Sequence, residues 1–214
     1  MNSVSPAMKP LLLALTIILP LAHVAPAQPT HTNHAKAKVS FADFKALVTE
    51  VEDHRAGRLI DLNTFLKMAQ EPGVIILDSR STSRYERLHI KGAKHLSFTD
   101  FTQDNLKRVI PSFDTKILIY CNNNFEGNQV DFASKVALPR PQPGRAEASQ
   151  FAAQARPRMM ALNIPTYLNL FGYGYRNVYE LDELVNVKDP RITFEGTVAQ
   201  PPSILTPRAP ASLK

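Results

Sequence analysis

Short apolar runs recur along the central part of the chain. Residues 74–77 and 116–120 have the length of strands and are rich in β-branched and aromatic side chains, which is typical of strands buried on both faces. Two further strands are expected over residues 93–98 and 177–181. Together these four runs predict the core of a sheet.

The segments before and between these runs have helical spacing instead. Apolar residues over 41–51 recur on one face, with Ser40 as the expected N-cap, and Asp61 is the expected N-cap of a helix over residues 62–68. Because strands alternate with helices, the pattern predicts an α/β fold with a parallel sheet and helices on both faces. Further helices are expected over residues 83–87 and 160–170, the latter with Pro165 at or near its first turn.

The first 27 residues have the features of an export signal. Lys9 precedes the apolar stretch 11–22, and Ala25-Pro26-Ala27 has the small residues of a cleavage site. The apolar stretch is too short to cross a bilayer and contains Pro20, which makes a membrane anchor the weaker alternative. We therefore expect an exported protein, periplasmic if bacterial and otherwise secreted, with no stable membrane association after cleavage.

The rest of the chain divides by composition. Residues 28–38 are polar and are expected to form a disordered leader, and residues 39–188 contain the whole predicted domain. Within the domain, residues 139–158 hold a proline cluster and an Ala/Gln-rich run, which predicts a surface insert. Residues 189–214 are rich in proline and are expected to form an extended tail.

Composition narrows the classes of function. Hydrophobic residues make up 44% of the chain, enough for a core, and the net charge of +6 comes from dispersed lysines and arginines. Because these basic residues form no stripe and are not interleaved with aromatic ones, nucleic-acid binding is not expected. The chain has one cysteine, so an exported form cannot make an internal disulfide. No cofactor or metal site is predicted.

The single cysteine, Cys121, directly follows the strand predicted at 116–120. Catalytic groups of α/β sheets gather at the carboxyl ends of strands, which makes Cys121 a candidate nucleophile; the alternative is a buried structural cysteine. In the polar loop that follows, N–H groups could surround the sulfur and asparagines could adopt left-handed conformations. An accessible thiol is therefore expected. The loop consists of Asn122, Asn123, Asn124, Phe125, Glu126 and Gly127.

Four short motifs occur in order along the domain. They are Asp78-Ser79-Arg80 with Tyr85, then His89-Ile90-Lys91-Gly92-Ala93, then Cys121, and finally Gly174-Tyr175-Arg176-Asn177-Val178-Tyr179. This series resembles the signature of rhodanese-like domains over residues 61–181. The resemblance implies a small α/β domain with a five-stranded parallel sheet. It also implies that Cys121 carries a persulfide and passes sulfur from a donor such as thiosulfate to an acceptor.

The loop after Cys121 departs from the family pattern. Loops of active sulfurtransferases are rich in glycine and basic residues, whereas this loop has no basic residue and contains Glu126. A carboxylate near the sulfur is expected to raise the pKa of Cys121 and to repel thiosulfate. Phosphate hydrolysis, the activity of related phosphatases, is not expected because no arginine closes the loop. The motif residues Asp78, Arg80 and His89 are expected to support the site without taking part in the chemistry.

Two functions from different classes remain open. The first is an enzyme, a sulfurtransferase that carries a persulfide on Cys121 and acts on a small sulfur-containing substrate. The second is a non-catalytic rhodanese-like module that binds or regulates an unidentified protein partner through the loop and the insert. The retained cysteine favours the first function, and the uncharged-to-acidic loop favours the second.

The N-terminal sequence of the mature protein tests the predicted export signal and its cleavage after Ala27. N-terminal sequencing of the exported protein should begin at Gln28, because the small residues Ala25 and Ala27 stand three and one positions before the cleavage. A mature, membrane-bound form that still begins at Met1 would contradict this prediction.

Overall fold

The computed structural model of the protein describes residues 35–138 and 157–199. Residues 35–39 form a short stretch by themselves, in which the Val39 N–H donates to the Ala37 carbonyl. The folded domain begins at Ser40. The predicted export signal, most of the leader and nearly all of the insert lie outside the described residues.

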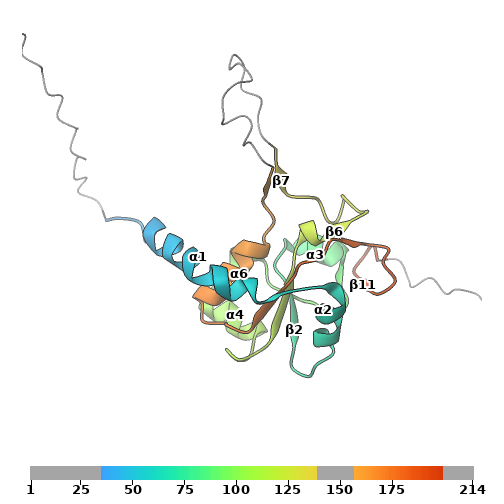
Figure 1. Ribbon diagram of the computed structural model, residues 1–214, viewed down its shortest axis with the longest axis horizontal. Helices are drawn as coiled ribbons and strands as arrows, with labels where there is room; N and C mark the ends of the chain where they lie inside the picture. The colour runs from blue at the N-terminus through green and yellow to red at the C-terminus, as the bar shows by residue number, and fades with distance from the viewer. Residues whose placement is uncertain (1–34, 139–156, 200–214) are drawn as a thin grey trace, which may run out of the picture. The chain divides into compact units, whose positions relative to one another are not determined.

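A five-stranded parallel sheet forms the centre of the domain, in the strand order β1-β9-β5-β2-β4. This confirms the predicted α/β fold. Strand β2 of the sheet is labelled in Figure 1. The edge strand β1 was not predicted, because a two-residue strand carries no periodic pattern. The strands are β1 (Leu59–Ile60), β2 (Ile75–Asp78), β4 (Lys94–His95), β5 (Ile117–Tyr120) and β9 (Val178–Leu181).

Helices cover both faces of this sheet. The expected caps are present: the Ser40 side chain accepts the N–H of Asp43, and the Asp61 side chain accepts the N–H of Thr64. These bonds satisfy N–H groups that have no partner within their helix. The helices are α1 (Phe41–Ala56), α2 (Leu62–Ala69), α3 (Thr82–Arg87), α4 (Gln103–Val109) and α6 (Asn163–Gly172), with short 3-10 turns at Phe98–Asp100 and Asn122–Asn124.

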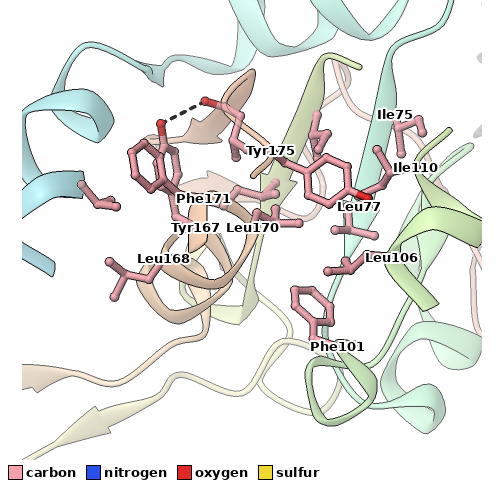
Figure 2. Packing of buried hydrophobic residues seen from close by; sticks show 14 residues of the cluster. Ile75, Leu77, Phe101, Leu106, Ile110, Tyr167, Leu168, Leu170, Phe171 and Tyr175 are labelled. Carbon is pink, nitrogen blue, oxygen red and sulfur yellow. Dashed lines mark hydrogen bonds between the residues drawn. The ribbon is translucent and has the colours of Figure 1, made fainter. Parts of the chain in front are cut away.

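Two hydrophobic cores result from the alternation of side chains along the strands. Ile117 and Ile119 of β5 face the core under α1, α4 and α6, whereas Leu118 and Tyr120 face the core under α2. Figure 2 shows the first core, where α6 supplies Tyr167, Leu168, Leu170 and Phe171. Because β5 is buried on both faces, it is apolar throughout rather than alternating.

The first turns of α1 extend past the core. Leu47 packs against the core and Val51 is buried in it, whereas Phe41 and Phe44 on the same predicted face are 80% and 49% exposed. The amphipathic pattern therefore predicted the helix correctly, but the helix packs on the core only from Leu47 onward. Within the two described ranges, no helix is long and apolar enough to cross a bilayer.

Three pairs of short strands extend the structure beyond the central sheet. β6 (Phe125–Glu126) pairs with β10 (Val185–Asn186), and β7 (Val136–Ala137) pairs with β8 (Arg158–Met159) at the base of the insert. β3 (His89–Ile90) pairs with β11 (Phe194–Glu195).

The pairing of β11 corrects the predicted start of the tail. Residues 189–199 belong to the domain, because Ile192 is buried and the N–H groups of Thr197 and Val198 donate to carbonyls of Glu86 and Arg87. The prolines that suggested an extended tail begin only at Pro201. The apolar residues before them have a surface to pack on, which the sequence pattern did not reveal.

Substitution of Ile117 by alanine tests the central strand. Because Ile117 is fully buried, the change should lower the free energy of unfolding by about 2–5 kcal/mol, from lost burial and the cavity left behind. Urea unfolding measures this loss. The matched control is Ile164→Ala at a position that is 49% exposed, which should cost about 0.5 kcal/mol or less. Equal losses in the two variants would contradict the assignment.

Candidate active site

The carboxyl ends of three neighbouring strands meet at one edge of the sheet. β2 ends at Asp78, β9 ends at Leu181, and Cys121 follows the last residue of β5, which lies between them. Cys121 is therefore in the position predicted from the sequence, at the carboxyl end of the central strand.

The sulfur of Cys121 is enclosed. The residue is 1% exposed, so the prediction of an accessible thiol is wrong for this structure. Its Sγ accepts a hydrogen bond from the backbone N–H of Leu162, at a distance of 3.3 Å. Leu162 is the N-cap residue of α6, so the sulfur lies at the N-terminal end of a ten-residue helix.

Topology explains how a residue 41 positions away reaches the sulfur. β5 and β9 are neighbouring parallel strands, and α6 is the crossover helix between them. A crossover helix runs back along the sheet, so it begins near the carboxyl end of the strand before it. A hydrogen bond of 2.7 Å between the hydroxyl groups of Ser79 and Thr166 attaches the first turn of α6 to the end of β2.

Asn124 connects the cysteine to its surroundings. Its side-chain oxygen accepts the backbone N–H of Cys121 and the side-chain N–H of Asn163, both at 2.9 Å. Its side-chain nitrogen donates to the carbonyl of Leu181, at the end of β9, at 2.7 Å. One amide thus joins the ends of β5 and β9 to the start of α6.

The other two asparagines of the loop have different surroundings. The Asn123 side chain accepts the N–H of Lys135 at 2.7 Å and donates to the carbonyl of the same residue at 3.0 Å. Asn122 is buried, and its side-chain oxygen has no hydrogen-bond partner among the described residues. This side-chain oxygen beside the cysteine therefore accepts no hydrogen bond from the part of the chain that the structure describes.

The backbone of the loop differs from the expected cradle. Asn122–Asn124 form a 3-10 turn and Phe125 and Glu126 continue as a strand, with no asparagine in the left-handed region. Gly127 alone has a positive φ, of 84°, at the turn that follows. The prediction that asparagines of the loop adopt left-handed conformations is therefore wrong. The loop is stabilised by hydrogen bonds of the asparagine side-chain amides instead.

Burial raises the pKa of the Cys121 thiol above its ordinary value, since the thiolate loses its hydration. The N–H groups of Leu162 and Asn122 act in the opposite direction, because hydrogen bonds to sulfur favour the charged form. The carboxylate of Asp78 raises the pKa further, and the guanidinium of Arg80 lowers it. Glu126 is exposed on β6, so the repelling carboxylate expected there is directed to solvent rather than buried with the sulfur.

Asp78 and Arg80 form a buried ion pair beside the site. The guanidinium donates to both carboxylate oxygens, with a shortest distance of 2.7 Å, and both side chains are at most 2% exposed. The Tyr120 hydroxyl donates to the same carboxylate at 2.5 Å. Burial and this carboxylate raise the pKa of Tyr120 well above its ordinary value, so the phenol stays neutral.

Arg80 also joins the segments on either side of the site. It donates to the carbonyls of Leu88 and Asp131, and its guanidinium lies 4.5 Å from the centre of the Phe132 ring. The N–H groups of the Arg80 guanidinium thus bind groups inside the protein, and the Asp78 carboxylate balances its charge. The structural role predicted for the Asp78-Ser79-Arg80 motif agrees with this geometry.

The contacts of His89 agree with the supporting role that the sequence predicted for it. Its Nδ1 lies 2.7 Å from the carbonyl oxygen of Tyr85, and its ring stacks on the Tyr85 ring at 3.9 Å. Its Nε2 lies 3.9 Å from the carboxylate of Glu195 on β11. Within the described ranges, no group of three His, Cys, Asp or Glu side chains is arranged to hold a metal ion.

Sequence analysis missed Leu162, Asn163 and Thr166 as residues of the site, and it named Ser79 in a motif without predicting its contact with Thr166. A helix near residue 160 was predicted, but its start was not connected with Cys121. The crossover rule for parallel strands would have made this connection.

These features define an α/β protein with a buried cysteine at the junction of its central strand and a crossover helix. The sequence profile of the rhodanese-like domain matches residues 61–183, more than half of the chain, and the protein belongs to this family. The predicted resemblance is thereby confirmed.

Solved structures with low sequence identity are similar to the chain. The BH2092 protein from Bacillus halodurans is 18% identical, with 73% of this chain and 88% of that chain covered and a TM-score of 0.38. The Alr3790 protein from Anabaena sp. is 19% identical, with 63% and 88% covered and a TM-score of 0.34. A Rhodanese_3 like domain of Alr3790 is 20% identical, with 57% and 92% covered and a TM-score of 0.31. No curated protein matches the chain.

Substitution of Arg80 by leucine tests the buried ion pair. The change leaves the Asp78 carboxylate buried without its partner, which should cost about 3–5 kcal/mol in the free energy of unfolding. Urea unfolding at neutral pH measures the loss. The control is Arg108→Leu at an exposed position of α4, which should change stability by about 0.5 kcal/mol or less. A loss below about 1 kcal/mol for Arg80→Leu, typical of an exposed pair, would contradict this role.

Proposed function

We propose that this protein is an exported rhodanese-like sulfurtransferase that carries a persulfide on Cys121. The observation that carries the proposal is the hydrogen bond from the Leu162 N–H to the cysteine sulfur. It places the sulfur at the N-terminal end of α6, where the helix dipole and the first N–H groups stabilise negative charge. The features of residues 1–27 support export.

The chemistry follows from this placement. The Cys121 thiolate attacks the outer sulfur of a donor such as thiosulfate, and the S–S bond of the donor breaks. Sulfite leaves with the electron pair of that bond, and Cys121 becomes a persulfide. Attack on the persulfide by an acceptor thiolate then passes the outer sulfur on and restores the cysteine. The N–H groups of Leu162 and Asn122 stabilise the sulfur anion at the start and end of this cycle.

The same environment predicts slow transfer from thiosulfate. Burial favours the neutral thiol, and the nearby guanidinium of Arg80 is bound to Asp78 instead of being free for an anion. Uncharged asparagine amides occupy the loop where active family members have basic residues. We therefore expect turnover that is limited by thiolate formation and by weak attraction of the anionic donor.

A second candidate is a non-catalytic rhodanese-like module, and the enclosure of Cys121 favours it. In that case the cysteine fills the junction of β5 and α6 as a small apolar side chain. The two functions differ in whether the sulfur forms a persulfide at all.

Intact mass after incubation with thiosulfate distinguishes them. The wild type should slowly gain the mass of one sulfur atom, and Cys121→Ser should gain none. Because the thiolate is the reactive form and its pKa is raised, the rate should increase with pH through and above the ordinary range of a thiol. The absence of a persulfide at every pH, with a thiol that iodoacetamide still modifies, would support the non-catalytic module.

Glu126→Arg serves as an electrostatic comparison in the same assay. It replaces an exposed negative charge by a positive one, so it should increase the rate with anionic thiosulfate and leave the rate with neutral iodoacetamide unchanged. An equal increase with both reagents would show that the substitution changes access to the thiol instead of attracting the anion.

A further inference from the structure

A five-residue segment, Arg158–Leu162, leads from the insert to the start of α6 beside Cys121, and it is called the lid segment below. Its last residue donates the N–H that reaches the sulfur. Its first residues form β8, paired with β7 at the base of the insert. Since Cys121 is 1% exposed, a donor cannot reach the sulfur unless part of the surrounding structure moves.

The lid segment is attached mainly by polar contacts. The N–H of Met160 donates to the carbonyl of Lys135 at 2.7 Å, and Asn123 binds the backbone of the same lysine through both of its amide atoms. At the other end, Asn163 donates to Asn124 at 2.9 Å. Asn123 also contacts the lid segment directly, with its side-chain nitrogen 3.9 Å from the sulfur of Met159, and Asn124 binds the residue that follows the segment.

Little apolar surface holds the lid segment down. Met159 and Met160 are 68% and 59% exposed, and Arg158 is also exposed. The helix that follows is anchored independently, through the bond between Thr166 and Ser79 and through the buried side chains Leu168, Leu170 and Phe171. A segment with few buried contacts next to a well-packed helix is a candidate for local opening without global unfolding.

We propose that the lid segment is a gate, which opens while the sheet and α6 stay folded, and that Asn123 and Asn163 control how often Cys121 becomes accessible. The importance of this gate for sulfur transfer rests on the proposed function. The gating itself concerns only access to the thiol, and it can be measured without any sulfur donor.

The rate of alkylation by iodoacetamide, followed by intact mass, measures the opening. Cys121 is the only cysteine, so each added group reports this site alone. The wild type should react far more slowly than the same protein in denaturant. Asn123→Ala and Asn163→Ala should each react roughly three- to tenfold faster than the wild type, the factor expected for the loss of about one net hydrogen bond. The double variant should multiply the two factors.

Asn169→Ala is the matched control. Asn169 is on the same helix and donates to the carbonyl of Pro165, but it makes no contact with the loop asparagines or the lid segment among the described hydrogen bonds. Its alkylation rate should equal that of the wild type. Urea unfolding of every variant separates local opening from a general loss of stability.

Three outcomes would overturn the gate. The wild type could react as fast as the denatured chain, the two asparagine variants could react no faster than the wild type, or all rates including the control could follow global stability. Hydrogen exchange provides an independent measurement: the N–H of Leu162 should exchange faster than that of Leu170 in the wild type, and faster still in Asn163→Ala. Accelerated alkylation without persulfide formation would preserve the gate and reject the sulfurtransferase.

Discussion

The parallel pairing of β5 with β9 is the constraint on which the site depends. Two neighbouring parallel strands need a crossover, and α6 supplies it by running back from the carboxyl end of β5. The start of α6 is therefore brought to the residue that follows β5, which is Cys121. The position of α6 is fixed by its packing on the sheet and by the bond between Thr166 and Ser79.

At the carboxyl edge of the sheet, the charged side chains and the neutral amides occupy different places. Asp78 and Arg80 neutralise each other in the interior, and the surrounding carbonyls and the Tyr120 hydroxyl complete their hydrogen bonds. Around Cys121, by contrast, the asparagines supply uncharged amides. A buried ion pair is tolerated only when its hydrogen bonds are satisfied, and here the pair connects the segments that flank the site.

Two features of the site act in opposite directions on the ionisation of Cys121. The N–H group of Leu162 at the start of α6 favours a sulfur anion, whereas burial of the thiol disfavours it. Opening would restore hydration to the thiolate and give access to a donor at the same time. In the proposed gate, one segment would therefore control both the reactivity and the accessibility of the thiol.

The local sequence pattern was sufficient to predict the central strands, two helix caps and the position of Cys121. The buried runs around Ile76 and Leu118, the caps at Ser40 and Asp61, and the position of Cys121 after a strand all follow from propensity and periodicity over a few residues. The role of His89 as a support was also predictable, because it depends on a nearby carbonyl.

Tertiary structure alone decided the contacts between distant segments. The Leu162 N–H reaches Cys121 across 41 positions, and Ile192 and β11 pack on a surface formed by residues near His89. No local pattern predicts such long-range contacts, because the helix or strand propensity of each residue is the same with or without its distant partner. The enclosure of the thiol belongs to this group, since burial depends on what the rest of the chain places above a residue.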